Sequence, residues 1–226
     1  MIIAIDGTSS SGKSTLSKAL AKNIKFAHLN TGSIYRAISL LVLKQNIPLS
    51  STQQIINCAK KANIKVVFEH GESEVYINGI KETKSLRSPE VSNVVAEIAK
   101  IEGVRKCTRI IQNNVANASD NLIVEGRDIG SVVFPNAEIK IFITASPEIR
   151  AQRRLNEYLS LGAKKTLKEV LKELNERDEA DTTRKHSPLV IPKGAIIFDT
   201  SDYNIAEGTA ALTKLVKDKI REINNK

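Results

Sequence analysis

The stretch IIAIDGTSSSGKST, residues 2–15, decides the fold of this chain. Its first part, Ile2–Ile5, is apolar and rich in β-branched side chains, which is typical of a strand buried on both faces of a parallel sheet. A glycine- and serine-rich loop follows, and from Lys13 onward apolar residues recur at helical spacing. A strand, a glycine loop and a helix in this order predict the start of a βαβ unit.

Residues 7–14, GTSSSGKS, match the phosphate-binding pattern G-x-x-x-x-G-K-[ST] at every position. The glycines allow backbone N–H groups to turn toward phosphate oxygens, and the following helix directs its positive end at the same anion. Lys13 can neutralise the β and γ phosphates, and the Ser14 hydroxyl can ligate Mg²⁺. We therefore predict a nucleotide site in this loop. Its residues are Gly7, Thr8, Ser9, Ser10, Ser11, Gly12, Lys13, Ser14 and Thr15.

The rest of the chain alternates between helical and strand-like patterns, which predicts an α/β protein with a parallel central sheet covered by helices on both faces. Asn78-Gly79 between two short strands indicates a hairpin, so residues 63–90 are interpreted as a small antiparallel insert. The other expected strands are 122–124, 139–143 and 195–199. The expected helices are 13–22, 32–45, 52–62, 91–118 with an interruption near Gly103, a charged stretch over 148–179, and 205–223.

The chain of 226 residues has 34 Lys and Arg against 25 Asp and Glu, a net charge of +9, which first suggests an anionic partner. Only 4% of residues are aromatic and none is Trp, which disfavours a base-stacking nucleic-acid platform. Two cysteines and three scattered histidines form neither a disulfide framework nor a zinc site. Asp6 comes too early for a signal peptide, and no apolar run is long enough for a membrane span, so a reducing cytoplasm is expected.

The phosphate-binding pattern alone does not choose among kinases, GTPases and motor ATPases. The N-K-x-D and D-x-x-G patterns of a GTPase are not found where they could serve, and a motor ATPase would need a longer chain. Size and the placement of arginines favour a small-molecule phosphotransferase. A kinase for another acceptor, such as UMP, AMP or a small metabolite, stays open, as does a basic nucleic-acid-binding protein that hydrolyses ATP as a switch.

Four further segments carry arginines or acids that suit phosphate chemistry. The segment Asn30–Arg36 opens a helix, and Glu125–Asp128 ends a buried strand, where ligands of parallel sheets bind. Arg150, Arg153 and Arg154 share one helix face as a positive stripe, and 177–184 is a charged run. Helix capping, surface ion pairs or solvated faces would explain each segment alone. Arginines that neutralise phosphate and exclude water would explain all four together.

These motifs make the chain resemble the bacterial cytidylate kinases of the long form, a family of nucleoside monophosphate kinases. The resemblance covers essentially the whole chain and depends on IDGTSSSGKST (5–15), TGSIYR (31–36) and EGRDIGSVVFP (125–135), followed by Arg153-Arg154, Glu176–Asp178, Asp181 and Arg184. It implies a P-loop NTPase-type three-layer α/β/α fold, and phosphorylation of CMP and dCMP by ATP with Mg²⁺. It also implies a core (1–31, 92–151 and 180–226), an acceptor-binding region (32–91) and a lid (152–179).

The same resemblance implies a role for each matching residue. Residues 7–15 and the lid residues Arg153 and Arg154 would bind ATP, and Ser14 and Glu125 would hold the metal, the latter directly or through water. The catalytic residues would be Lys13, Arg127, Arg177 and Arg184. The CMP site would comprise Thr31, Tyr35, Arg36, Arg105, Gly126, Arg127, Asp128, Asp181 and Arg184. Among these, Arg105 and Asp128 would recognise cytosine and Asp181 the sugar. The family expectation is a monomer that acts on small molecules, not on nucleic acid or membranes.

Three positions depart from the family pattern. Glu125 stands where Asp is usual, which keeps a carboxylate but moves it by one methylene, and Thr31 stands where Ser is usual. Ala96 stands where a cytosine-contacting Ser is expected, which puts one base contact in doubt and suggests weaker base discrimination. The histidines and the cysteines Cys58 and Cys107 are interpreted as structural or solvated, because the transfer needs no general base and no thiolate.

Overall fold

The computed structural model describes residues 1–160 and 162–225. Residue 161, in the predicted lid, and residue 226, at the end of the predicted core, lie outside the described residues. The chain divides into two compact units: unit 1 comprises Met1–Lys25 and Glu125–Lys226, and unit 2 comprises Phe26–Val124.

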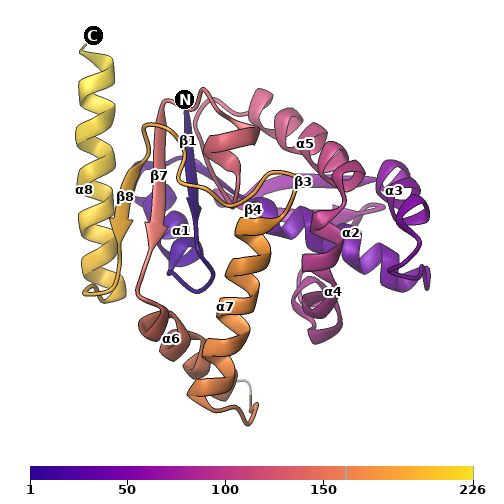
Figure 1. Cartoon of the computed structure of the whole chain (residues 1–226). Coiled ribbons are helices and arrows are strands. Elements are labelled where there is room, and N and C mark those ends of the chain that lie inside the picture. The colour runs from indigo at the N-terminus through magenta and orange to yellow at the C-terminus, as the bar shows by residue number, and fades with distance from the viewer. Residues whose placement is uncertain (161, 226) are drawn as a thin grey trace. The chain divides into compact units, whose positions relative to one another are not determined.

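Unit 1 is built on three parallel strands in the order β1 (Ile2–Gly7), β7 (Ile139–Thr144) and β8 (Ile196–Asp199) (Figure 1). The β-branched runs predicted from the sequence form this sheet, and β1 and β7 pair so that Ile5 lies beside Ile141, both fully buried. Helix α1 (Lys13–Ile24) packs against β1 and against α8 (Ile205–Asn224). The sheet therefore presents the carboxyl end of β1 at the start of the phosphate-binding loop.

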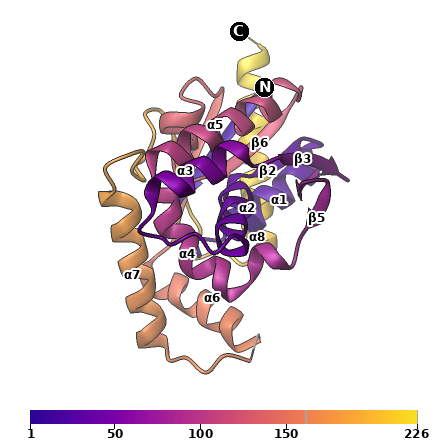
Figure 2. The same ribbon diagram turned by 90° about the vertical axis from the view of Figure 1, so that its right-hand side faces the viewer.

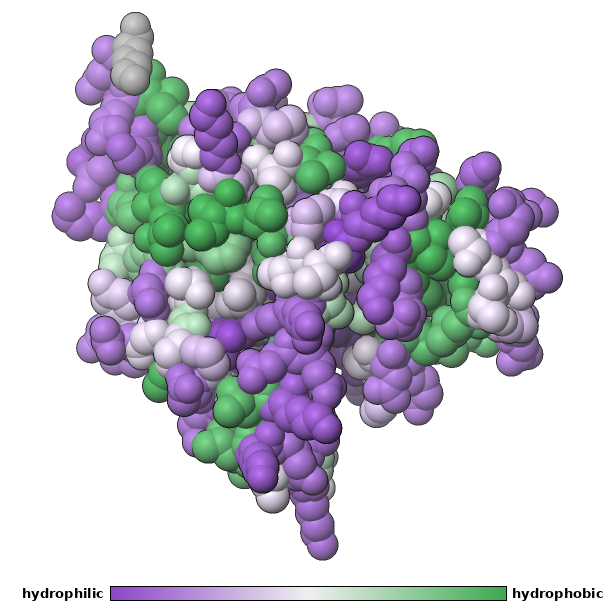
Figure 3. Space-filling model, viewed as in Figure 1, coloured by the Kyte–Doolittle hydropathy of each residue, from purple (hydrophilic) through white to green (hydrophobic). Residues whose placement is uncertain are grey.

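Helices α6 (Pro147–Ser160) and α7 (Leu167–Thr183) form an antiparallel hairpin in unit 1 (Figures 1 and 2). The charged stretch predicted over 148–179 is thus two helices. Thr166 and Glu169 make a capping box that starts α7. Ala151, Val170 and Leu174 form a small core between the two helices, while Figure 3 shows that the outer face of α7 is hydrophilic. The hairpin has its own apolar contacts.

Unit 2 has a mixed sheet in the order β3 (Ile64–Glu69), β4 (Glu72–Ile77), β2 (Ala27–Asn30) and β6 (Leu122–Gly126), the last of which continues into unit 1. Strand β5 (Ile80–Glu82) pairs with β4, and positive φ values at Asn78 and Gly79 confirm the predicted hairpin turn. The predicted antiparallel insert is not a separate excursion, because β4 also pairs in parallel with β2 and extends the sheet. Strand β2 was not predicted.

The helices of unit 2 are α2 (Thr31–Lys44), α3 (Thr52–Lys61), α4 (Pro89–Lys100) and α5 (Glu102–Asn117), with a short 3₁₀ turn, η1 (Ser85–Arg87). Helix α2 packs on α4, and α3 runs beside α5 (Figure 2). The predicted interruption near Gly103 is confirmed, since α4 ends at Lys100 and the chain is extended at Ile101. Gly103 lies inside α5, where an added Cβ would come within 2.6 Å of Ile56 Cδ1, so close helix packing explains this glycine.

Both units combine helices with sheet, and the predicted α/β class with mostly parallel strands is confirmed. Figure 3 shows apolar surface gathered over β8 and the segment before it, where Val190, Ile191 and Ile197 are exposed. Within the residues that the structure describes, no helix has the length and apolarity needed to cross a membrane.

Candidate active site

The phosphate-binding loop joins β1 to α1 as predicted, and two of its glycines are required for different reasons. A Cβ on Gly7 would lie 2.0 Å from the carbonyl oxygen of Ile143, so the loop leaves the sheet where only glycine fits. Gly12 has φ 80° and serves as the N-cap of α1, a left-handed conformation that glycine adopts at no steric cost. The Ser11 hydroxyl donates to the carbonyl of Thr8 at 3.0 Å and closes the loop.

Lys13 begins α1 among charged groups of both signs. Burial lowers the pKa of its ammonium, the carboxylates of Glu125 and Asp6 raise it, and Arg127 and Arg177 lower it further. The net direction is downward. These interactions bring five of the site's charged residues into one electrostatic neighbourhood within unit 1. Lys13, Arg127 and Arg177 repel one another there, so an incoming anion with several negative charges would be stabilised.

Asp6 connects the phosphate-binding loop to the segment that follows β6. Its Oδ1 accepts from the N–H of Ile129 and its Oδ2 from the N–H of Gly130, both at 2.7 Å. Burial raises the pKa of Asp6 to about 6 despite these hydrogen bonds, with a smaller upward contribution from Asp128. Residues Ile129–Val133 form one π-helical turn, η2, in which the N–H groups of two valines donate to the Asp128 carbonyl. Asp6 therefore fixes the position of Asp128 and its neighbours.

Asp181 lies between two arginines of the predicted catalytic set. Arg127 Nε is 3.2 Å from its Oδ2, and Arg184 Nη1 is 3.2 Å from its Oδ1. Arg127 also donates to the carbonyl of Gly7, which ties it to the start of the phosphate-binding loop, and Arg184 Nε donates to the carbonyl of Ser187 at 2.6 Å. The end of β6, the loop and the end of α7 thus meet in one cluster of alternating charge.

The predicted positive stripe on α6 is wrong for Arg150. Its side chain is only 6% exposed, forms an ion pair with Asp178 on α7, and donates to backbone carbonyls of Ser9 and Ala145. Its neighbours Arg153 and Arg154 lie nearer the surface. Arg150 is therefore part of the interior of unit 1.

Arg153 and Arg154, predicted to bind ATP, have different environments. Arg153 donates to the hydroxyl of Thr200 at 2.8 Å and to its carbonyl at 2.7 Å. The Thr200 hydroxyl in turn donates to the carbonyl of Ser11 at 2.9 Å, which links Arg153 to the phosphate-binding loop. Arg154 instead pairs with Glu157 at 2.7 Å and stacks on Tyr158 within the α6–α7 hairpin. Arg153 is thus the one of this pair that is connected to the loop.

The predicted CMP residues of unit 2 are brought together at the start of α2. Thr31 is its first residue and is buried, and Arg36 donates to the carbonyl of Leu86 at 3.1 Å and to the Ser92 hydroxyl at 2.9 Å. Tyr35 stacks on the guanidinium of Arg105 at 5.4 Å. Arg105 is 3% exposed and donates to the carbonyl of Ala99 at 2.8 Å. The other CMP residues, Gly126, Arg127, Asp128, Asp181 and Arg184, belong to unit 1.

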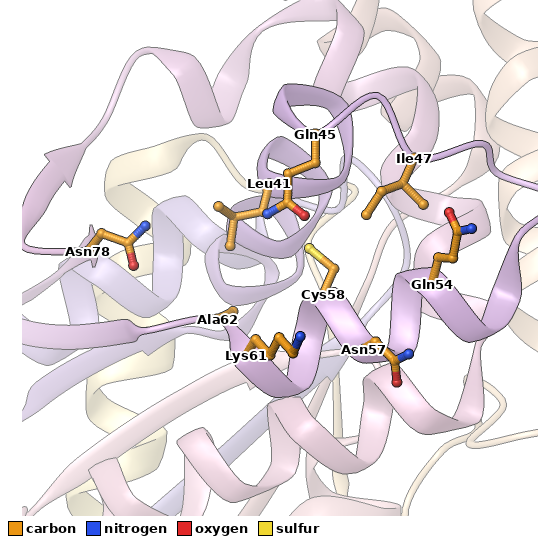
Figure 4. A pocket seen from close by; sticks show the side chains of 9 residues that line it. All are labelled: Leu41, Gln45, Ile47, Gln54, Asn57, Cys58, Lys61, Ala62 and Asn78. Atoms are coloured by element: carbon orange, nitrogen blue, oxygen red, sulfur yellow. The ribbon is translucent and has the colours of Figure 1, made fainter.

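A surface pocket of about 340 Å³ lies at the other end of α2 (Figure 4). Figure 4 shows the Cys58 thiol and the side chains of Leu41 and Gln45 around it. Burial raises the pKa of Cys58, which keeps the thiol protonated. Because α2 has 14 residues, its two ends are about 20 Å apart, so this pocket is separate from Thr31. It takes no part in the candidate site.

The residues of unit 1 fit a Mg²⁺ ion that is shared with nucleotide phosphates. Within residues 1–160 and 162–225, no three His, Cys, Asp or Glu side chains form a metal cluster. Mg²⁺ commonly needs only one or two protein oxygens, since phosphate and water supply the rest. Ser14 lies in the first turn of α1, and Glu125 is 1% exposed and acts electrostatically on Lys13. A hydroxyl and a carboxylate are therefore available beside the phosphate-binding loop.

Comparison with known proteins settles the family. A model of the cytidylate kinase family matches residues 3–218. The chain belongs to the cytidylate kinase family. The cytidylate kinase of Thermotoga sp. strain RQ2 is 42% identical over 218 residues, which cover 96% of this chain and 97% of that protein. The cytidylate kinase of Carboxydothermus hydrogenoformans is 40% identical over 219 residues, covering 97% and 98%.

A solved structure supports the fold independently. An uncharacterized protein from Eubacterium ventriosum aligns with a TM-score of 0.51 over 96% of this chain and 98% of that chain. The two are 12% identical, so the likeness concerns the fold alone. The family resemblance inferred from the motifs is confirmed by the sequence matches, and the roles of single residues stay predictions.

Asp6, Arg150, Asp178 and Thr200 were not among the residues predicted to bind substrate or metal, although they hold parts of the site in place. For Asp6 a sequence signal existed, because a charged residue at the end of an apolar strand needs partners when it is buried. Arg150 and Asp178 looked like members of solvated charge runs, and Thr200 follows a strand with no distinguishing pattern. Their partners are far away in the chain, so only the folded structure identifies them.

Proposed function

We propose that this member of the cytidylate kinase family phosphorylates CMP and dCMP with ATP, giving CDP and dCDP. The family match over residues 3–218 carries the proposal. The chemistry of unit 1 supports it, since the phosphate-binding loop, Lys13 and three arginines gather positive charge at one place. Such a site suits phosphoryl transfer, which depends mostly on positioning and charge neutralisation.

In the proposed reaction an acceptor phosphate oxygen attacks the γ-phosphorus of ATP, the bond from that phosphorus to the β–γ bridging oxygen breaks, and ADP leaves. A phosphate monoester has a second pKa of about 6, so its oxygen is already ionised at neutral pH and needs no general base. Loop N–H groups and Lys13 would hold the β and γ phosphates. Arg127, Arg177 and Arg184 would neutralise charge on the transferred group and exclude water.

When bound, Mg²⁺ would neutralise charge on the β and γ phosphates. Ser14 and Glu125 are the residues proposed to hold it, Glu125 directly or through water. The carboxylate of Glu125 lies one methylene further from the backbone than that of the Asp that the family pattern favours. Its burial and its interaction with Lys13 are compatible with both direct and water-mediated binding of the metal.

For CMP we propose the residues that the family resemblance implies. Thr31, Arg36, Arg127 and Arg184 would bind its phosphate, Arg105 and Asp128 the cytosine, and Asp181 the sugar, with Tyr35 and Gly126 completing the set. Arg36 now donates to a neutral carbonyl and a hydroxyl. A phosphate dianion is a stronger acceptor than either, which favours exchange of these partners on binding. The cation–π contact with Tyr35 holds the Arg105 guanidinium in a defined orientation.

The division into a core, an acceptor-binding region (32–91) and a lid (152–179) belongs to the same proposal, as do ATP contacts by Arg153 and Arg154. The separate apolar core of the α6–α7 hairpin is what a lid that moves as one piece needs. Free Cys58 and Cys107 suit a reducing cytoplasm, and the low aromatic content suits small-molecule substrates in preference to nucleic acid. A monomer is the proposed state.

The deciding experiment is a coupled ADP-release assay with Mg-ATP and CMP, dCMP, UMP, AMP, GMP or shikimate as acceptor. We expect CMP and dCMP to accelerate ADP release well above the rate of ATP hydrolysis alone. Equal or greater acceleration by another acceptor would replace the proposed substrate. Stimulation by DNA or RNA without stimulation by CMP would favour a nucleic-acid-dependent switch.

A further inference from the structure

Arg150 and Asp178 hold both backbone polar groups of one residue in the phosphate-binding loop. Arg150 Nη1 donates to the carbonyl of Ser9 at 3.3 Å, and Asp178 Oδ1 accepts from the N–H of Ser9 at 3.4 Å. The two side chains form an ion pair with each other, and Arg150 Nε donates to Ala145 at 3.1 Å. Arg150 is 6% and Asp178 17% exposed, so water competes little for these bonds.

A buried ion pair of this kind contributes more to geometry than to net stability, because desolvation offsets most of the attraction. The geometry that this ion pair maintains is that of the phosphate-binding loop. Ser9 is followed by Ser10, a non-glycine residue with φ 57°, which is a strained conformation that its surroundings must maintain. By fixing both the N–H and the carbonyl of Ser9, Arg150 and Asp178 maintain the bend that follows it.

The same two residues stand at the base of the α6–α7 hairpin. Arg150 lies in the first turn of α6, and Asp178 lies in the last two turns of α7. The apolar core of Ala151, Val170 and Leu174 joins the two helices beyond this point. A displacement of Ser9 therefore affects both α6 and α7. The apolar core between the two helices makes them move together.

Asp178 also sets the rotation of α7. Arg177 and Asp181 are four residues apart, so they share one side of α7, and Arg184 is the residue that caps the helix end. Arg177 acts on Lys13, and Asp181 joins Arg127 to Arg184. Because Asp178 is adjacent to Arg177 and is held by Arg150, a rotation of α7 that moved the three charged groups would have to break this ion pair.

We infer that Arg150 and Asp178 are positioning residues that couple nucleotide binding at the phosphate-binding loop to the ordering of the α6–α7 hairpin. A nucleotide phosphate in the loop shares the Ser9 N–H with Asp178, and the change in Ser9 is transmitted through the ion pair to both helices. The inference depends on the proposed function only in requiring that the loop binds ATP, and it is independent of the identity of the acceptor.

The test is hydrogen–deuterium exchange of the full chain, with and without saturating Mg²⁺ and a non-hydrolysable ATP analogue. The variants are Asp178→Asn, Arg150→Lys and a matched control, Glu173→Gln. Glu173 forms an exposed ion pair with Lys165 at 2.5 Å on the same hairpin, so this control removes a carboxylate from α7 without touching Ser9. Circular dichroism shows whether each variant folds.

In the unchanged protein and in Glu173→Gln we expect the analogue to slow exchange in peptides of the loop and of both helices. In Asp178→Asn the loop should remain protected at saturation, while protection of α6 and α7 falls to half or less. Arg150→Lys keeps the charge but loses the guanidinium fork, so it should recover part of the coupling, and it tests the inference if Asp178→Asn does not fold. In the coupled assay, the kcat of Asp178→Asn should fall about tenfold, with the KM for ATP little changed.

Hairpin protection in Asp178→Asn equal to that of the unchanged protein would overturn the inference. Protection of the loop without protection of the hairpin in the unchanged protein would also overturn the inference. The proposed function would not be affected by that result. If the analogue protected neither region, nucleotide binding by the loop would be wrong and the inference would fall with it.

Discussion

The carboxylate of Asp6 accepts a hydrogen bond of 2.7 Å from the backbone N–H of Gly130, and its other oxygen accepts one of the same length from Ile129. Strand β1 is thereby attached to the π-helical turn that follows Asp128. The attachment needs a fully buried charge, and this burial raises the pKa of Asp6 to about 6. The charge that aligns the two parts of the site therefore destabilises the fold at neutral pH.

The first prediction concerns the pH dependence of stability. The pKa of Asp6 is raised above its usual 3.8, so its folded state retains the proton more strongly than the unfolded state does. This contribution is fully present below pH 3.8 and is lost as the pH rises through about 6. Between pH 4 and pH 7 the unchanged protein should lose about 2 kcal/mol relative to Asp6→Asn, because most of the change in protonation falls in this range and one pKa unit corresponds to about 1.4 kcal/mol.

Urea unfolding of both proteins at several pH values measures this difference directly. Asp202→Asn, at an exposed position, is the matched control for the loss of one carboxylate. A difference between Asp6→Asn and the unchanged protein that is the same at pH 4 and pH 7 would show that Asp6 does not titrate in this range.

The second prediction compares two glycines. At Gly7 a Cβ would meet the Ile143 carbonyl oxygen at 2.0 Å, and the three nearest atoms are all backbone atoms of Ile143, so no flexible side chain can move away. Gly79 has φ 82° in the β4–β5 turn but has no atom within 4 Å of an added Cβ. Gly7→Ala should therefore cost about 3 kcal/mol or more, whereas Gly79→Ala should cost only the strain of a left-handed alanine, about 1–2 kcal/mol.

Thermal and urea unfolding of the two alanine variants test this order. Equal costs for both would mean that β1 and β7 separate easily at the loop, in conflict with the paired register of Gly7 and Ile143.

Local sequence patterns were sufficient to predict the features that are formed by neighbouring residues of the chain. The phosphate-binding loop, the buried strands and the Asn78-Gly79 turn depend on residues close together in the chain, and each lies where it was predicted. The same holds for the segment Glu125–Asp128, because it follows directly from the end of a buried strand.

Contacts between distant segments could not be predicted in this way. The parallel pairing of β4 with β2 joins His28 to Glu72, and nothing in either strand specifies the other. The burial of Arg150 depends on Asp178 and Ser9, which are 28 and 141 residues away. A positive stripe and a buried ion pair have the same local pattern, and only tertiary packing distinguishes them.

The third prediction concerns Lys13. Its ammonium is the mobile positive charge at the start of α1, and it interacts electrostatically with the carboxylates of Glu125 and Asp6. Lys13→Ala should reduce kcat about 10³-fold, the usual cost of losing one group that stabilises charge in a transition state. Lys22→Ala, at an exposed position of the same helix, should keep full activity.

Circular dichroism should show the same helix content for both lysine variants. If Lys13→Ala retained full activity in the coupled assay, the role given to the phosphate-binding loop would be refuted.

The last prediction separates base recognition from phosphate binding. Asp128 is 5% exposed and is held by the turn that Asp6 fixes, so removing its carboxylate leaves the backbone of the turn in place. If Asp128 binds cytosine, Asp128→Ala should lower kcat/KM for CMP by about 10- to 100-fold, the value of one buried hydrogen bond to a charged group. The KM for ATP should change little, because no base contact with the donor is lost. With UMP as a poor acceptor the loss should be smaller, so the ratio of CMP to UMP activity should fall. Steady-state kinetics with both acceptors give this ratio, and an equal loss with each would mean that Asp128 supports the site without recognising the base.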